Sequence, residues 1–265
     1  MRIEPALPAG VVAAAGTDEL VAASLARELS LPLLPTGTNP RQCDQVGLVL
    51  LVSGSSRALQ LTGTSAPGAV AVDFGAGSMR HRRRSGHNEL LGRAVGVGKK
   101  QRLTVLDATA GLGRDSFVLA DLGCRVYLCE RNPLVQQLLC HGLEAARGSD
   151  DKWLRSVASA MELVPGDARK LPALPADCDV IYLDPMFPQR DKSAAVKKEM
   201  ALFHRLLQDE PGDGAELLQW ALAREVARTV VKRPPRAGPL GGLPPSHSIQ
   251  GKAVRYDVYV KRALS

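Results

Sequence analysis

Aromatic residues are scarce in this chain, at 4% of 265 residues, and cysteines number only five. The cysteine count is odd and no Cys-X-X-Cys pair occurs, so neither a zinc ribbon nor a disulfide framework is expected. Reduced thiols in a cytoplasmic protein are the simpler interpretation. Apolar runs long enough to cross a membrane are lacking, and the short, glycine-broken N-terminal stretch is a poor signal peptide.

Acidic residues are outnumbered by basic ones. The chain has 34 Lys and Arg against 27 Asp and Glu, which leaves a formal net charge of +7. A basic excess favours a polyanionic partner such as a nucleic acid. The hydrophobic share of 45% is ordinary for a globular protein, and with few aromatics the core must consist of Val, Leu and Ala.

The pattern of predicted elements changes near residue 93. Residues 1–93 alternate short apolar runs with Pro, Gly, Ser and Thr, which predicts a small N-terminal α/β subdomain followed by a basic segment. In residues 94–265, strands alternate with helices. That alternation is typical of a mostly parallel sheet with helices on both faces.

A glycine-rich loop follows the first strand of the second part. The letters DATAGLGRD place Asp107, Gly111, Gly113 and Asp115 between a buried strand and a helix. Glycines let the backbone approach a ligand closely, and a helix N-terminus offers free N–H groups. NAD is the alternative ligand, but its third glycine is Ser116 here, and two acids would lie awkwardly beside a pyrophosphate. The flanking acids suit an amine-bearing cofactor, S-adenosylmethionine.

Acidic residues also follow the next strands. Glu130 ends the second strand, where a carboxylate can accept hydrogen bonds from both ribose hydroxyls. Asp167 and Ala168 follow the third strand and are placed to reach an adenine amino group. Asp184 ends the fourth strand. Because ligands of open α/β sheets bind beyond the carboxyl ends of strands, we expect these residues to surround one site.

The stretch DPMFP begins with Asp184 and Pro185 and includes Phe187. These residues could simply end a strand in a turn. Alternatively, Asp184 and the backbone around Pro185 accept hydrogen bonds from an exocyclic base amine, whose lone pair is otherwise delocalised into the ring. Phe187 would then stack on the base. We favour the second interpretation because the expected cofactor loop converges on the same edge of the sheet.

Basic residues cluster in two further regions. Four arginines within five positions repel one another unless an anion is near, and other basic residues follow two strand ends. A solvated charged surface is the alternative to contact with RNA phosphates. The residues that we predict to contact RNA are Arg80, Arg82, Arg83, Arg84, Lys192, Lys197, Lys198, Lys232 and Arg233.

Five motifs in sequence order carry a family resemblance. The segments DATAGLGRD, CERNP, YLDPMFP, KSAAVKKEM and VVKRP together resemble the ribosomal small-subunit methyltransferase J family, over about Val72 to Tyr259. The resemblance implies a class I methyltransferase (Rossmann-like) fold with a mostly parallel seven-stranded sheet. It also implies methyl transfer from S-adenosylmethionine to the exocyclic N2 amine of a guanine in 16S rRNA.

The resemblance further implies roles for individual residues. Arg114 and Asp115 would contact the cofactor after the glycine loop, and Glu130 and Arg131 would lie on its ribose side. Direct in-line transfer needs no metal ion, and the partner would be 16S rRNA or the small ribosomal subunit. Three alternatives stay open: another exocyclic amine such as adenine N6 of RNA or DNA, a non-catalytic RNA-binding assembly factor, and a nicotinamide dehydrogenase.

Overall fold

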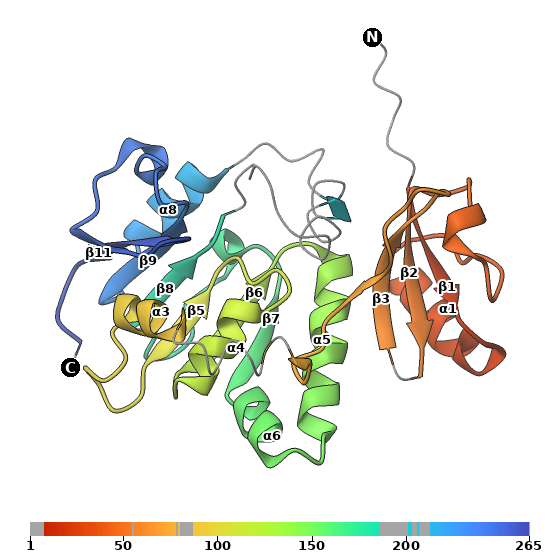
Figure 1. The fold of residues 1–265 in the computed structure, drawn as a ribbon, viewed down its shortest axis with the longest axis horizontal. Coiled ribbons are helices and arrows are strands. Elements are labelled where there is room, and N and C mark those ends of the chain that lie inside the picture. Colours follow the sequence, from red (N-terminus) through yellow and green to blue (C-terminus); the bar gives the residue numbers. More distant parts are fainter. Residues whose placement is uncertain are drawn as a thin grey trace, which may run out of the picture. The chain divides into compact units, whose positions relative to one another are not determined.

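The computed structural model describes residues 8–54, 56–77, 79, 87–185, 201–202, 206 and 213–264. These residues form two compact units (Figure 1). The first unit contains the described residues up to Val72 and those within Gln189–Asp209, and the second contains the others. Helix α3 (His87–Val95), which spans the predicted boundary at residue 93, belongs to the second unit. A functional division at that residue stays a prediction.

The first unit contains a four-stranded sheet in the order β1-β2-β3-β4. Its strands are β1 (Ala9–Ala13), β2 (Leu48–Ser53), β3 (Ser56–Leu61) and β4 (Val70–Ala71). Strands β1 and β2 are parallel and the other pairs are antiparallel. A 3-10 turn (Gly16–Asp18) leads into α1 (Glu19–Glu28), which packs beside β1, and a second turn covers Pro40–Gln42.

The second unit contains a seven-stranded sheet in the order β10-β11-β9-β8-β5-β6-β7. Its strands are β5 (Thr104–Asp107), β6 (Arg125–Glu130), β7 (Met161–Pro165), β8 (Val180–Leu183), β9 (Arg228–Arg233), β10 (His247–Gln250) and β11 (Arg255–Val260). The five strands from β9 to β7 pair in parallel, whereas β11 is antiparallel to both of its neighbours. The prediction of a mostly parallel seven-stranded sheet is confirmed.

Helices pack on both faces of this sheet. They are α3, α4 (Arg114–Asp121), α5 (Pro133–Gly148), α6 (Lys152–Ser159) and α8 (Gly214–Leu222), with 3-10 turns at Ala168–Lys170 and Leu240–Gly242. Leu217 and Leu218 of α8 share a core cluster with Leu106 of β5. Side chains alternate along a strand, so Asp107 faces the opposite side, where Ser116 of α4 contacts it.

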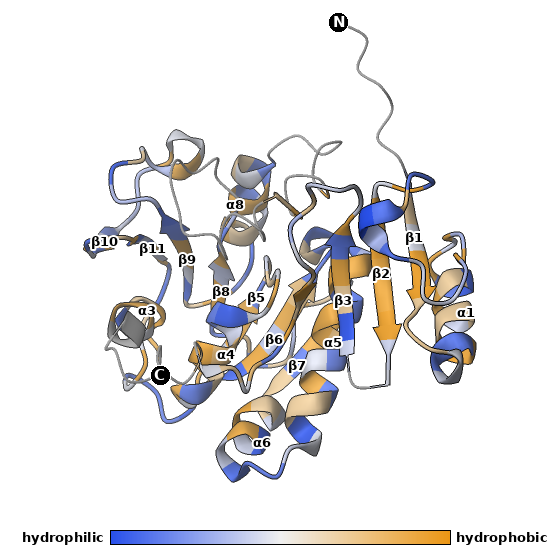
Figure 2. Cartoon of the chain, turned by 45° about the vertical axis from the view of Figure 1, so that its right-hand side comes forward, coloured by the Kyte–Doolittle hydropathy of each residue, from blue (hydrophilic) through white to orange (hydrophobic). Residues whose placement is uncertain are grey.

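Local sequence explains where these helices begin. Asn132 and Asp151 precede α5 and α6, and their side chains accept hydrogen bonds from the first free backbone N–H groups of each helix. Pro133 occupies the first turn of α5, where its missing N–H costs nothing. Figure 2 shows hydrophobic colour concentrated in strands such as β2 and β6. In the part of the chain that the structure describes, no helix combines the length and apolar character needed to cross a membrane.

Candidate active site

The carboxyl ends of five parallel strands meet at one edge of the second unit's sheet (Figure 1). Ligands of open α/β sheets bind beyond such an edge. The residues at or just beyond these ends include Asp167, Glu130, Asp107, Asp184 and Lys232. The fold therefore gathers predicted site residues that lie far apart in the chain.

The glycine loop between β5 and α4 needs glycine at Gly113. Its φ of +71° lies in the left-handed region that L side chains rarely adopt. A Cβ at this position would also lie 2.8 Å from the Leu139 side chain and 3.0 Å from the Phe74 ring. The loop can pass this closely over the core only because no side chain is present at Gly113.

Glu130 links the glycine loop to the end of β6. Its Oε2 accepts a hydrogen bond from the Gly111 backbone N–H at 2.9 Å, and its Oε1 accepts one from the Asn132 N–H at 2.8 Å. Burial raises the pKa of this carboxyl, although both hydrogen bonds oppose the shift. A ribose reaching Glu130 would meet a carboxylate whose orientation is already set by the backbone.

Asp107 is a buried carboxyl directly beneath the loop, with 2% of its surface exposed. It accepts hydrogen bonds from the Ser116 hydroxyl at 2.5 Å and from the Thr109 backbone N–H at 3.1 Å. Burial raises its pKa to about 7, and the nearby charges of Asp115 and Asp184 add to the effect of burial. Asp107 thus holds Thr109 of the loop and Ser116 of α4 in place.

Asp115, Tyr182 and Lys232 form a connected group on the α4 side of the sheet. One Asp115 oxygen, Oδ2, accepts hydrogen bonds from the Tyr182 hydroxyl and the Lys232 ammonium, each at 2.7 Å. The same ammonium lies 2.7 Å from Oδ2 of Asp184. Lys232 therefore joins a residue of the predicted cofactor loop to the carboxylate of the DPMFP motif.

Asp184 stays accessible despite these contacts. Its side chain keeps 37% of its surface exposed, and its backbone N–H donates to the Thr109 hydroxyl at 2.6 Å. Pro185 is half-buried and lies against Gly214 at the start of α8. Phe187 lies outside the described residues, so its stacking role stays a prediction.

The predicted adenine side contains an ion-pair network. Asp167 accepts hydrogen bonds from the backbone and the side chain of Arg169, and the side-chain bonds hold the pKa of Asp167 below its usual value. Arg169 also lies 2.7 Å from Asp213, and Arg131 donates to the same Asp213 oxygen at 2.8 Å. Ala168 is buried, with 2% of its surface exposed. This network connects the loop after β7 with the residue that precedes α8.

The structure describes only part of the predicted RNA-contacting set. Arg114, which was predicted to contact the cofactor and not RNA, is exposed on the first turn of α4. Lys232 lies inside the site, and Arg233 is 8% exposed and donates to the Gly238 carbonyl oxygen at 2.5 Å. The other predicted RNA-contacting residues lie outside the described part: Arg80, Arg82, Arg83, Arg84, Lys192, Lys197 and Lys198.

Three functional-site neighbours were not expected from the sequence. Tyr182 reads as an ordinary core residue of a buried strand, and Arg169 and Asp213 lie outside the quoted motifs. Tyr182 bonds Asp115 across 67 positions, and Asp213 bonds Arg131 across 82 positions. Arg169 pairs with the distant Asp213 as well as with its neighbour Asp167. No local sequence pattern predicts contacts between residues this far apart in the chain.

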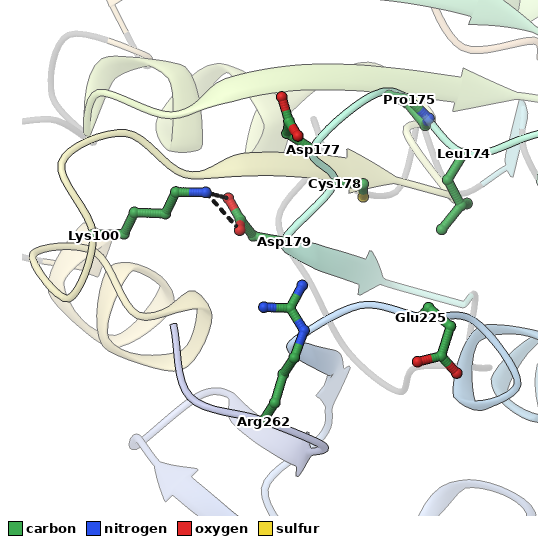
Figure 3. A pocket seen from close by; sticks show the side chains of 8 residues that line it. All are labelled: Lys100, Leu174, Pro175, Asp177, Cys178, Asp179, Glu225 and Arg262. Carbon is green, nitrogen blue, oxygen red and sulfur yellow. Dashed lines mark hydrogen bonds and ion pairs between the residues drawn. The ribbon is translucent and has the colours of Figure 1, made fainter. Parts of the chain in front are cut away.

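A separate pocket of about 270 Å³ lies near the amino end of β8 (Figure 3). There the Lys100 ammonium lies 2.9 Å from Asp179, whose other oxygen accepts a hydrogen bond from the Thr104 backbone N–H. These contacts tie the beginning of β5 to the beginning of β8, at the sheet edge opposite the candidate active site. Among the described residues, no group of three or more His, Cys, Asp or Glu side chains could hold a metal ion.

Comparisons with known proteins point to one family. Residues 38–261 match the family model described as "Putative SAM-dependent methyltransferase". The ribosomal RNA small subunit methyltransferase J of Thioalkalivibrio sulfidiphilus is 50% identical over 246 residues, which cover 90% of this chain and 92% of that protein. The protein of the same name from Marinobacter nauticus is 45% identical, with 92% and 88% coverage. A solved SAM-dependent methyltransferase from Neisseria gonorrhoeae is 34% identical, with a TM-score of 0.70 and 96% and 97% coverage.

Proposed function

Since the chain belongs to the ribosomal RNA small subunit methyltransferase J family, we propose that it methylates the exocyclic N2 amine of a specific guanine in 16S rRNA. The family, the class I Rossmann-like fold and S-adenosylmethionine as cofactor were predicted from the sequence and are confirmed. The proposal adds the base, the atom and the RNA to that membership.

The described residues fit the cofactor. Gly113 lets the loop backbone lie close to the core, and α4 begins directly after that loop, where a helix N-terminus offers free N–H groups. Glu130 offers a fixed carboxylate for ribose hydroxyls, and Asp167 lies on the expected adenine side. The chemistry that bound S-adenosylmethionine supplies is an electrophilic methyl group on a positively charged sulfur.

The target amine would be oriented at Asp184. Its partly exposed carboxylate lies at the end of β8, beside the glycine loop, and can accept a hydrogen bond from the amine. That contact directs the nitrogen lone pair towards the methyl group and stabilises the positive charge that develops as the N–C bond forms and the S–C bond breaks. The surplus amine proton then leaves past Asp184 to solvent. We propose that Phe187 stacks on the base.

Electrostatics supports RNA as the partner. The chain carries a formal net charge of +7, and several predicted phosphate contacts flank the motifs of the site. Phosphate contacts orient a nucleic acid without reading its sequence. We therefore propose that 16S rRNA or the small ribosomal subunit binds across the site, in the cytoplasm.

The observation that carries this proposal is the partly exposed Asp184 carboxylate at the same sheet edge as the cofactor residues. Mass spectrometry of 16S rRNA from a strain lacking the gene should show the loss of one N2-methylguanosine. A wild-type copy should restore it. Asp184→Ala should not, because removing one transition-state contact costs about 10²–10³-fold in rate.

Controls separate chemistry from binding. Asp184→Ala should bind S-adenosylmethionine nearly as well as the wild type in calorimetric titration, and Asp150→Ala, which removes an exposed carboxylate between α5 and α6, should methylate normally. An unchanged guanine profile in the deletion strain would refute the substrate, and loss of N6-methyladenosine instead would establish the adenine alternative. Full activity of Asp184→Ala would refute the role of that carboxylate.

A further inference from the structure

Lys232 is enclosed by acidic groups from two other elements. Its ammonium lies 2.7 Å from Oδ2 of Asp115, on the first turn of α4, and 2.7 Å from Oδ2 of Asp184, after β8. Its side chain keeps 27% of its surface exposed. A lysine ammonium has three N–H donors, and two of them are directed at carboxylates of the site.

The strand register produces this arrangement. Leu183 of β8 lies opposite Val231 of β9, so the residues that follow, Asp184 and Lys232, are next to each other at the sheet edge. Side chains alternate between faces, and Leu183 and Val231 belong to the core cluster under α8. Asp184 and Lys232 therefore point to the opposite face, on which Asp115 lies.

We propose that Lys232 is a positioning residue for methyl transfer, which holds the Asp184 carboxylate ionised and in the orientation that accepts the target amine. This inference rests on the proposed function and assigns Lys232 a role other than contact with RNA phosphates. Asp115 and the Tyr182 hydroxyl that binds it fix the ammonium from the other side. The Asp184 carboxylate is thereby tied through Lys232 to the first turn of α4.

Lys232 acts as a fixed positive charge and not as the base that removes the amine proton. Burial favours its neutral form, but the charges of Asp115 and Asp184 and their hydrogen bonds to it outweigh burial and raise its pKa. A protonated ammonium has no lone pair with which to take a proton. The amine proton therefore leaves past the Asp184 carboxylate and not through Lys232.

Removal of the ammonium would leave carboxyl groups facing one another. The titratable groups around this point are Asp107 of β5, Asp115 of α4, Tyr182 of β8, Asp184 and Tyr256 of β11, the cross-strand neighbour of Lys232. Without a cation between them, neighbouring carboxylates in a partly buried site cannot all stay ionised near neutral pH. A proton on Asp184 would turn the hydrogen-bond acceptor of the amine into a donor.

The experiment compares Lys232→Met with Lys232→Arg in the full-length protein. Methylation of 16S rRNA and of small subunits is followed from pH 5.5 to pH 9, and S-adenosylmethionine binding is measured by calorimetry. The matched control is Lys261→Met, because Lys261 pairs with the exposed Glu225 at the far end of the sheet.

We expect Lys232→Met to lower kcat about 100-fold at neutral pH, with cofactor affinity within a few-fold of the wild type. The acidic limb of its pH–rate profile should move to higher pH by about one unit or more. Lys232→Arg should recover part of the rate, since the charge remains while the geometry changes. Lys261→Met should behave as the wild type.

A second measurement does not depend on the substrate. Carboxyl ¹³C NMR of aspartate-labelled protein should show one more carboxyl holding a proton at neutral pH in Lys232→Met than in the wild type. Wild-type kcat and an unshifted profile in Lys232→Met would overturn the inference, as would loss of cofactor binding or unchanged carboxyl titration. Failure of the proposed function can be told apart from failure of this inference. In the first case the wild type itself would leave 16S rRNA unmethylated, and the NMR comparison would still decide the role of Lys232.

Discussion

At the scale of single residues, the site is built from carboxyl groups that already accept hydrogen bonds from the protein itself. Both oxygens of Glu130 accept backbone N–H groups, and the Asp107 carboxyl is held by Ser116 and Thr109. Such carboxylates cannot rotate freely to suit a ligand, so less conformational freedom remains to be lost on binding. Prior fixation of these groups favours accurate placement of the cofactor.

The buried carboxyl of Asp107 should make the free energy of unfolding depend on pH. Its pKa is about 7 in the folded chain against an ordinary 3.8, so the folded state binds more protons than the unfolded state between these values. Its contribution to stability therefore falls as pH rises from about 4 to about 7. As pH rises over that range, the free energy of unfolding of Asp107→Asn should increase by on the order of 1–4 kcal/mol relative to that of the wild type.

Urea unfolding of both proteins at several pH values between 4 and 8 measures this difference. Asp150→Asn serves as the control, because Asp150 is exposed and should leave the pH dependence of the wild type unchanged. Parallel stability curves for the wild type and Asp107→Asn would contradict the prediction.

At the scale of elements, the junction between β5 and α4 positions the site. The scarce aromatics gather beside it: the Phe74 and Phe117 rings stack at 5.0 Å, and the Trp153 ring of α6 meets Phe117 edge-on at 5.6 Å. Gly113 lies directly against Phe74 and Leu139. The loop is therefore supported by packed rings and side chains that have little room to move.

Gly113→Ala should destabilise the protein in two ways. Alanine at a positive φ costs about 1–2 kcal/mol, and its Cβ would overlap Leu139 and Phe74, which adds about 1–3 kcal/mol. Gly98→Ala is the matched control, because Gly98 also has a positive φ, +86°, but faces open space. Equal losses of unfolding free energy in the two variants would show that the close packing at Gly113 is unimportant.

At the scale of the whole molecule, the excess of positive charge governs the approach to RNA. A formal net charge of +7 attracts a polyanion at long range, and this attraction weakens as salt increases. The arginines at positions 80–84 supply the densest run of that charge, although they lie outside the described residues. Their contact with phosphates stays a prediction.

Replacing these four arginines with alanine should weaken RNA binding and its salt dependence together. Each phosphate contact on a single strand contributes about 0.7 to the slope of log K against log salt, so the slope should fall by about 3. This slope is measured by fluorescence anisotropy with a 16S rRNA fragment at salt concentrations from about 50 to about 300 mM. The four-alanine variant replaces Arg80, Arg82, Arg83 and Arg84.

A control variant loses the same number of charges elsewhere. It replaces the exposed residues Arg41, Arg102, Lys152 and Lys252. Net charge then falls equally in both variants, and only local contacts differ. Equal slopes in the two variants would assign the effect to overall charge and remove the arginine segment from the interface.

Much of the architecture was predictable because its signals are local. Pro133 and the preceding Asn132 mark the start of α5, and the apolar run before Asp184 corresponds to β8. The acids that end β5, β6 and β8 were expected at one sheet edge, because parallel strands expose their carboxyl ends together. Family membership followed from the order of the motifs and was confirmed.

The sequence by itself determined the family, the alternation of strands and helices in residues 94–265, and the acids that end β5, β6 and β8, because hydrophobic periodicity, caps and motifs act over a few neighbouring positions. Only the tertiary structure decided which of those residues touch. Lys232 was expected at a phosphate, yet its ammonium lies between Asp115 and Asp184, which are 117 and 48 positions away. Such contacts depend on the order and register of β5, β8 and β9, and sheet pairing over these separations is set by the packing of the whole domain.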